Sequence, residues 1–265
     1  MAVTYEKNGH KAYITLNRPE ALNAFNTDMG RELREAWLDF RADPNVWVAI
    51  VTGNGRAFSS GADVKELARA NSGAASGGQT VNYSGFWSSM YGLDSFEAGL
   101  EVWKPTIAAV NGHCLGIGCT LAITCDFRLA SDRAQFGFPE VKIGVPTIMA
   151  SIRLPKLVGM GPALELLLYG DSIDAQEAYR VGLVHRVIPH ERLLAAADEW
   201  ADRILLRGPT AVAATKEVTV RCSNLPLPDA VRMGEAIRRL ARTADDAKEG
   251  PRAFAEKRTP IWTGR

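Results

Sequence analysis

The sequence has no long apolar run and no apolar segment near its N-terminus. Its first ten residues, MAVTYEKNGH, are polar, and no stretch approaches the ~20 apolar residues of a membrane-spanning helix. The chain also lacks an excess of charge of either sign, because its formal net charge is only +1. Without a basic field it has no general attraction for nucleic acid. These absences predict a cytoplasmic protein that binds neither nucleic acid nor membranes.

Cysteine and histidine are scarce, and neither is spaced for metal binding. The four cysteines are Cys114, Cys119, Cys125 and Cys222, and no two of them form a C-x-x-C pair. Three of them lie in one apolar stretch, which favours reduced thiols packed in a core. The four histidines are scattered and show no H-E-x-x-H spacing. The sequence therefore predicts no metal site.

What the sequence does have is an ordinary globular composition, with 46% hydrophobic and 23% charged residues. Residues 3–7 and 11–16 alternate in polarity on either side of Asn8-Gly9, which predicts a β-hairpin. Four further segments have the apolar pattern of strands. They are residues 46–53, 106–110, 127–131 and 183–188.

Helical periodicity appears in two regions. Met29, Leu33, Trp37 and Phe40 recur at spacings of four, four and three, and Asp43-Pro44 ends that helix. Residues 190–258 are almost entirely helical in pattern and carry several apolar stripes, which favour self-association. The sequence thus predicts an α/β core over residues 1–190 and a helical C-terminal region over residues 191–265.

The segment between the strands leaves alternatives open. Residues 71–80 are rich in Gly and Ser without periodicity, which predicts either a flexible surface loop or a mobile rim over a pocket. The apolar residues that follow either line an acyl pocket or form the core-facing stripe of a helix. They are Trp87, Met90, Tyr91 and Leu93.

Small residues cluster in AFSSGADVKEL, residues 57–67, without an obvious catalytic side chain. Ser59 and Ser60 lack the G-x-S-x-G spacing of a serine nucleophile. Two interpretations remain. The turn either only caps a helix, or its backbone N–H groups act on a substrate.

A second cluster, VNGHCLGIGCTLAITCDF, follows the strand at 106–110. A dinucleotide fingerprint is excluded because residue 121 is leucine, and no G-K-[ST] of a P-loop follows. Gly116-Ile117-Gly118 either packs a helix closely on a sheet or leaves backbone N–H groups open at the helix start. Two such helix starts that meet at one oxygen would form an oxyanion hole for an enolate, with the amide of Ala62 as one donor.

Five segments of the chain, in order, resemble the successive signatures of one family. They are NRPEALNAFN, AFSSGADVKEL, KPTIAAVNGHCLGIGCTLAITCD, FGFPEVKIGV and DAQEAYRVGLVHRV. By this resemblance the chain is identified as a member of the crotonase superfamily, the enoyl-CoA hydratase/isomerase family. The resemblance implies an α/β fold of the crotonase (ClpP-like) type, a spiral of ββα units with a C-terminal helical trimerisation region. It also implies a homotrimer or homohexamer and an acyl-CoA thioester substrate, with coenzyme A as part of the substrate and no prosthetic group.

The same resemblance assigns roles to positions of this chain. Ala62 and Ile117 match the two oxyanion amides, and Ile117 stands where the family usually has a glycine. The positions that line coenzyme A are matched by Ala21, Leu22, Ala62, Asp63, Val64 and Lys65. Phe254 and Lys257 match a C-terminal element that reaches the coenzyme of a neighbouring subunit.

Hydratases of the family use two glutamates, of which this chain retains one. Glu140 matches the second glutamate, whereas Thr120 stands in place of the first. A hydroxyl cannot act as a general base near neutral pH without an activating partner, so hydration by two carboxylates is disfavoured. The resemblance leaves Glu140 as the single carboxylate acid/base, with Thr120 beside it. One base is enough to move a double bond through an enolate, as family isomerases do.

The expected activity is that of an enoyl-CoA hydratase or isomerase, and chemistry favours isomerisation or single-base hydration. Two other possibilities stay open. One is a decarboxylase or C–C lyase that uses the same enolate, and the other is a noncatalytic homologue that binds acyl-CoA or RNA. The near-neutral charge argues against RNA, and the presence of Glu140 argues against loss of catalysis.

Overall fold

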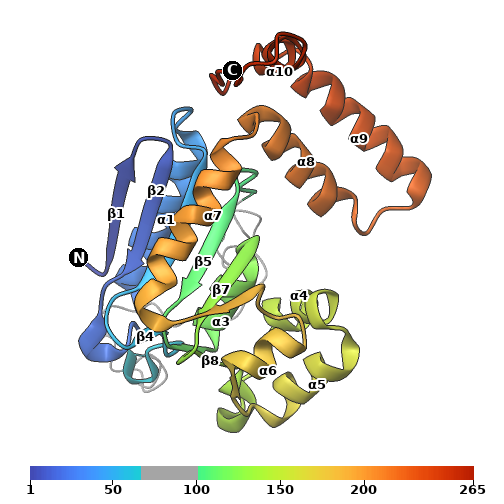
Figure 1. The fold of residues 1–265 in the computed structure, drawn as a ribbon. Coiled ribbons are helices and arrows are strands. Elements are labelled where there is room, and N and C mark those ends of the chain that lie inside the picture. The colour runs from blue at the N-terminus through green and yellow to red at the C-terminus, as the bar shows by residue number, and fades with distance from the viewer. Residues whose placement is uncertain (67–100) are drawn as a thin grey trace, which may run out of the picture.

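The computed structural model describes residues 1–66 and 101–265 (Figure 1). The Gly/Ser-rich segment at 71–80 and the apolar residues at 87–93 lie outside the described residues, so their alternatives stay as predictions. In the described part of the chain, no helix is long and apolar enough to cross a membrane.

A six-stranded sheet forms the centre of the fold, in the order β1-β2-β3-β5-β7-β10. Its strands are β1 (Val3–Asn8), β2 (Lys11–Leu16), β3 (Val48–Gly53), β5 (Thr106–Val110), β7 (Phe127–Ser131) and β10 (Arg186–Ile188). The β1–β2 pair is antiparallel, and the other neighbours are parallel. The predicted hairpin and strands are confirmed, except that the last strand begins at Arg186 rather than at Leu183. Leu183 and Val184 instead donate their N–H groups to Ala178 O, at the end of helix α6 (Ala175–Arg180).

A smaller sheet of four strands lies at one end of the first, in the order β4-β6-β8-β9. Its strands are β4 (Ala57–Ser59), β6 (His113–Leu115), β8 (Gln135–Gly137) and β9 (Ile173–Asp174). Each long strand β3, β5 and β7 continues into a short one, and a helical segment follows each pair. This repeated ββα unit is the predicted spiral. The turns between the paired strands require glycine, because a Cβ on Gly53 or Gly112 would lie only 2.2 or 2.1 Å from a carbonyl oxygen.

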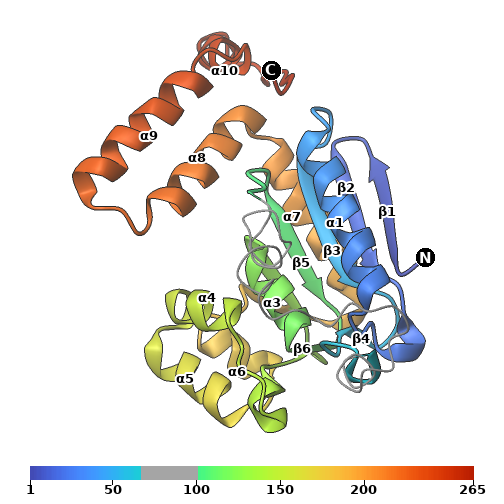
Figure 2. The same ribbon diagram turned by 180° about the vertical axis from the view of Figure 1, so that it is seen from behind.

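The two faces of the large sheet bury alternate residues of its strands. Ala49, Val51, Ala108 and Val110 face the core that contains α1 (Thr27–Ala42), whereas their neighbours face α7 (Leu193–Leu205). Figure 1 shows α7 in front of the sheet, and Figure 2 shows α1 and α3 (Ile117–Thr124) on the opposite face. The predicted helix at α1 is confirmed, since its four periodic residues are all buried. Burial on both faces is the usual situation of parallel strands.

The C-terminal region is helical, as predicted. Its helices after α7 are α8 (Pro209–Cys222), α9 (Leu227–Ala241) and α10 (Asp246–Ala255), and they project from the sheet in Figures 1 and 2. α7 itself packs on the sheet, whereas the division of the chain at residue 190 stays a prediction. Two further helices, α4 (Met149–Val158) and α5 (Met160–Tyr169), pack against each other below α8.

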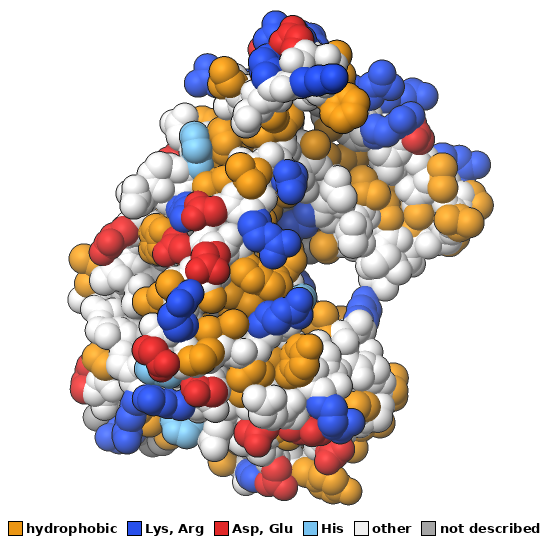
Figure 3. Space-filling model, in the orientation of Figure 1, with side chains coloured by type: hydrophobic (Ala, Val, Ile, Leu, Met, Phe, Trp, Pro, Cys, Tyr) orange, Lys and Arg blue, Asp and Glu red, His pale blue; other side chains and the backbone are white. Residues whose placement is uncertain are grey.

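We expect the purified protein to be a homotrimer or homohexamer. The projecting helices expose large apolar side chains that a monomer would leave in water, among them Leu227, Val231 and Leu240. Figure 3 shows apolar side chains gathered over the region of α8 and α9. Contiguous exposed apolar surface of this kind marks an interface. Sedimentation velocity at micromolar concentration should show a trimer or larger species. A single stable species of 28.8 kDa would contradict the expectation.

Candidate active site

Two strand–turn–helix junctions meet at the edge of the small sheet. The first runs from β4 through Gly61 into helical residues 64–66, and the second runs from β6 through Gly116 into α3. Both glycines have positive φ, 101° and 54°. A Cβ on Gly116 would lie 3.6 Å from the Cα of Gly61, and one on Gly61 would lie 3.2 Å from Leu115 O. The two backbones are therefore in contact, and their glycines make this approach possible.

Each junction has a backbone N–H with no acceptor in the described part of the chain. Phe25 forms a parallel bridge with Ala62, in which Phe25 N–H donates to Gly61 O and Asp63 N–H donates to Phe25 O, each at 2.8 Å. In such a bridge the N–H of the central residue, Ala62, points away from Phe25. Ile117 is the first residue of α3, so its N–H has no partner within the helix. No hydrogen bond between described residues uses either amide.

The serines beside this turn have a structural role. Ser59 is fully buried, its hydroxyl donates to Asn23 O at 2.8 Å, and it accepts from Gly61 N–H at 3.2 Å. α3 packs directly on it, since a Cβ on Gly118 would lie 2.5 Å from Ser59 Cβ. Ser59 therefore shapes the turn and is not available as a nucleophile.

Asn23 anchors the segment that contains Ala21 and Leu22. Its buried side-chain amide donates to Asn54 O and Ala57 O, at 2.9 and 2.8 Å. Leu22 and Asn23 both have positive φ, and Ser60 N–H donates to Leu22 O at 2.9 Å. The structure thus brings Ala21 and Leu22 next to the first junction. Sequence reasoning missed Asn23, although asparagine tolerates the left-handed conformation better than most residues.

The side chain of Asp63 caps the helical residues that follow it. Its Oδ1 accepts from the N–H groups of Lys65 and Glu66, and its Oδ2 pairs with Arg18 at 3.1 Å. Burial alone would raise the pKa of Asp63, but Arg18 and these two amides bring it below its usual value. Val64 is exposed, with 59% of its surface open, and Lys65 is exposed as well.

Glu140 lies beside the second junction. It belongs to the short 3-10 helix η3 (Pro139–Ile143), which begins with a proline and ends at Gly144 in the left-handed conformation. A Cβ on Gly116 would lie 3.3 Å from Glu140 Oε1. The other oxygen, Oε2, is buried and has no hydrogen-bond partner in the described chain. Burial raises the pKa of Glu140, and its own backbone amide and the hydroxyl of Thr147 oppose that rise.

Thr120 lies one turn into α3 and is 4% exposed. Its N–H donates to Gly116 O at 2.9 Å, and its spacing of three from Ile117 places both on one side of the helix. α3 has the sequence IGCTLAIT and carries no carboxylate. Among the described residues, the carboxylate beside the second junction is therefore that of Glu140, whereas the carboxylate of Asp63 at the first junction is engaged by Arg18 and two backbone amides.

Phe254 and Lys257 lie far from these junctions in the same chain. Phe254 is 87% exposed on α10, and Lys257 follows that helix with φ 53°. Figures 1 and 2 place α10 and β4 at opposite ends of the molecule. The prediction that these residues reach a neighbouring subunit stays a prediction.

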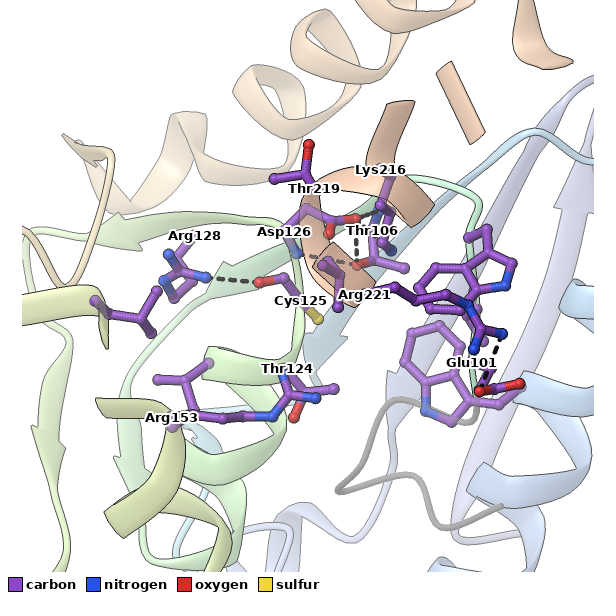
Figure 4. Close-up of a pocket in the computed structure, with 16 residues that line it drawn as sticks. Glu101, Thr106, Thr124, Cys125, Asp126, Arg128, Arg153, Lys216, Thr219 and Arg221 are labelled. Carbon is purple, nitrogen blue, oxygen red and sulfur yellow. Dashed lines mark hydrogen bonds and ion pairs between the residues drawn. The ribbon is translucent and has the colours of Figure 1, made fainter. Parts of the chain in front are cut away.

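A cavity of about 560 Å³ lies at the other end of α3 (Figure 4). Its polar side chains include two pairs, Lys216 with Asp126 at 2.7 Å and Arg221 with Glu101 at 3.1 Å. Asp126 also accepts from Thr106 N–H and Oγ1, which ties the end of α3 to β5. The apolar lining consists of Trp37, Val102, Trp103, Ile123, Leu157 and Val220.

Cys114, Cys119 and Cys125 are buried free thiols, as predicted, and burial raises the pKa of Cys114 and Cys125. Over residues 1–66 and 101–265, no group of three or more His, Cys, Asp or Glu side chains is placed to hold a metal ion.

The fold agrees with the comparison to known proteins. Residues 6–265 match the family model described as enoyl-CoA hydratase/isomerase. The chain therefore belongs to the enoyl-CoA hydratase/isomerase family of the crotonase superfamily, and the predicted crotonase fold is confirmed.

Individual relatives match over almost their whole length. The chain is 35% identical to a protein of Thauera aromatica named (E)-benzylidenesuccinyl-CoA hydratase, covering 100% of both chains. It is 38% identical to the carnitinyl-CoA dehydratase of Citrobacter koseri, covering 98% of each. The crystal structure of an enoyl-CoA hydratase from Mycobacterium tuberculosis superposes with a TM-score of 0.87 at 36% identity, covering 100% of this chain and 99% of that one.

Proposed function

We propose that the protein binds an acyl-CoA thioester, stabilises its enolate with the amides of Ala62 and Ile117, and transfers protons with Glu140. The observation that carries the proposal is the contact between two helix starts with open N–H groups, beside a half-buried carboxyl of raised pKa. Two such donors stabilise the negative charge that develops on the thioester oxygen as the enolate forms. Several relatives are named as enzymes of CoA thioesters, which supports this substrate class.

Coenzyme A would lie along the first junction. Ala21 and Leu22 are tied to it through Ser60, and Val64 and Lys65 are exposed next to Ala62. Lys65 offers an ammonium group to a phosphate, whereas Asp63 shapes this path, because its carboxylate is engaged by Arg18 and its N–H by Phe25 O. Phe254 and Lys257 would complete the site from a neighbouring subunit.

The acyl group would extend from the oxyanion hole along α3. The helix has eight residues, which at 1.5 Å per residue gives a length of about 12 Å. The cavity at its far end has both apolar and charged side chains in its lining, and its apolar side chains would hold the end of the acyl chain. Acyl groups long enough to reach it gain burial of apolar surface.

With one carboxylate, the chemistry is proton transfer by a single base. Glu140 in its ionised form takes a proton from C2 of a 3-enoyl thioester, and the resulting dienolate is held by the two amides. The protonated carboxyl then returns the proton to C4, which leaves the 2-enoyl thioester. A raised pKa suits both steps, because the group must accept and release a proton near neutral pH.

A mass-spectrometric screen against a panel of acyl-CoA thioesters tests the proposal. Double-bond shift or water addition is the expected result, with isomerisation the faster. Loss of carbon dioxide or chain cleavage would instead indicate a decarboxylase or C–C lyase on the same enolate. Binding without turnover, or RNA retained in a filter-binding assay, would indicate a noncatalytic homologue.

Thr120→Glu is expected to raise the initial rate of crotonyl-CoA hydration, by up to ~10²-fold, the lower end of what a positioned acid or base contributes. The substitution would restore a second carboxylate one turn into α3, where a threonine can orient water but cannot take its proton. The rate is followed by loss of absorbance of the enoyl thioester, after thermal melting confirms the fold, because Thr120 is buried.

Thr120→Gln is the matched control, since it has the size of glutamate without its acid–base function. Equal rates for the Glu and Gln variants would contradict the role given to the carboxylate. Wild-type hydration near the diffusional range of ~10⁸ M⁻¹s⁻¹ would show that the absent glutamate does not matter.

A further inference from the structure

Two buried side-chain oxygens near the second junction have no hydrogen-bond partner in the described chain. They are Glu140 Oε2 and Thr147 Oγ1. Burying a polar atom without a partner costs free energy, so such atoms are few in native proteins. Over the described residues the third atom of this kind, Trp37 Nε1, lies on α1. Two of the three therefore belong to one short segment, and one of those two is on the proposed acid/base.

The backbone brings Thr147 back toward Glu140. η3 ends at Gly144, whose φ of 73° reverses the chain, and Val145 N–H donates to Glu140 O at 3.0 Å. Thr147 follows Pro146 and directly precedes Ile148, the N-cap of α4. The threonine hydroxyl lies close enough to the carboxyl to oppose the effect of its burial, although no hydrogen bond of good geometry joins them.

We propose that Thr147 is a positioning residue whose hydroxyl donates to Glu140 Oε2 and keeps Oε1 directed at the turn of Gly116. The inference rests on the proposed function of Glu140 as the acid/base. A carboxyl with one oxygen held in this way has its second oxygen next to the helix start that carries the Ile117 amide. Glu140 would then accept and return the proton through Oε1, the oxygen that faces the enolate.

The donated hydrogen bond also favours the charged form of the base. Burial raises the pKa of Glu140, and Thr147 lowers it, so removal of the hydroxyl leaves burial less opposed. The charged groups on the surrounding elements are engaged or placed elsewhere. Lys142 pairs with Asp171, Lys156 binds Asn224, and Asp63 pairs with Arg18. Glu165 is exposed on α5, and Arg153 lines the cavity.

The test compares wild type, Thr147→Val and Thr147→Ser. Valine has nearly the shape of threonine but no hydroxyl. In Thr147→Val the pKa of Glu140 is therefore expected to rise, and the low-pH limb of the kcat profile should move to higher pH. On that limb kcat should fall about tenfold, the loss expected for one hydrogen bond to a charged group. Serine keeps the hydroxyl and should retain both the wild-type profile and the wild-type pKa. KM should change little, because Thr147 is not placed on the coenzyme path.

The pKa is measured without turnover, by carbon-13 NMR titration of glutamate-labelled protein, with the Glu140 signal assigned from its loss in Glu140→Gln. If the pKa of Glu140 in Thr147→Val equals the wild-type value, the inference is overturned. If Thr147→Val does not fold, Thr147→Ala takes its place. Ser151→Ala is the matched control, because Ser151 Oγ donates to Thr147 O at 2.5 Å in the first turn of α4. A shift in Ser151→Ala equal to that in Thr147→Val would also overturn it. Should Glu140→Gln remain active, the proposed function fails, while this titration still decides the role of Thr147.

Discussion

Glu140→Gln is expected to lower turnover of the enoyl-CoA substrate by ~10²–10⁴-fold, the usual contribution of a general acid or base. Glutamine keeps the size and polarity of the side chain but can neither accept nor release the proton. Acyl-CoA binding should stay near the wild-type value, since the proposed contacts with coenzyme A lie at the first junction. Steady-state rates give the loss of turnover, and calorimetric titration with a non-reacting acyl-CoA gives the affinity.

The stability of this variant separates lost chemistry from lost structure. Burial raises the pKa of Glu140 in the folded state, so the folded state binds more protons there than the unfolded state. Stability is then lost as pH rises through the interval between the unfolded and folded pKa values. A neutral glutamine does not titrate and so removes this loss of stability. At pH values above that interval, Glu140→Gln should therefore melt at a temperature no lower than that of wild type.

Glu165→Gln is the matched control, because Glu165 is exposed on α5, the helix that packs against η3. It should leave turnover unchanged. If Glu140→Gln turns over like wild type, Glu140 is not the acid/base and the site has been assigned wrongly.

Ala62→Pro is expected to slow turnover a few hundredfold, since loss of one oxyanion donor typically costs ~3–4 kcal/mol in the transition state. Proline has no N–H, so it removes the donor outright. The amide of Ala62 has no acceptor among the described residues, and its loss therefore breaks no hydrogen bond of the described fold. The effect should appear in kcat, because the oxyanion forms during the reaction.

Ala62→Gly is the control, because glycine changes the side chain and keeps the amide. Turnover of Ala62→Gly should stay close to the wild-type rate, lowered only slightly because glycine makes the turn more flexible. Circular dichroism and sedimentation must show that the proline variant folds and assembles as wild type does. If it does so and also turns over normally, the oxyanion hole lies elsewhere.

Local pattern was enough to predict most of the elements. The hairpin around Asn8-Gly9 and the period of α1 depend on neighbours a few residues apart, and both appear as expected. The prediction that the last strand starts at residue 183 was wrong, because an apolar pattern alone does not show which element a residue packs with. Leu183 and Val184 are apolar and buried, but they close the end of α6 rather than pair with β7, and their apolar character is the same in either case.

The contacts that build the site had no local signal. Asn23 is held by carbonyls of Asn54 and Ala57, more than thirty residues away, and Ser59 packs on Gly118 of a different unit. Parallel strands require long crossover connections, so their neighbours in space are distant in sequence. Thr147 was missed for another reason. A threonine between a proline and a helix carries no signal of its own in the sequence, and only the burial of its hydroxyl without a partner among the described residues distinguishes it.

The sequence by itself determined the family, the ββα repeat and the candidacy of Glu140, Ala62 and Ile117, because these depend on ordered local motifs. Only the tertiary structure decided that the turns of Gly61 and Gly116 touch, that Glu140 lies beside the turn of Gly116, and that Ser59 and Asp63 have structural roles. The physical reason lies in the range of the interactions. Periodicity and turn preference act over a few residues, whereas backbone contact, burial and the pKa of a carboxyl arise only when distant segments pack together.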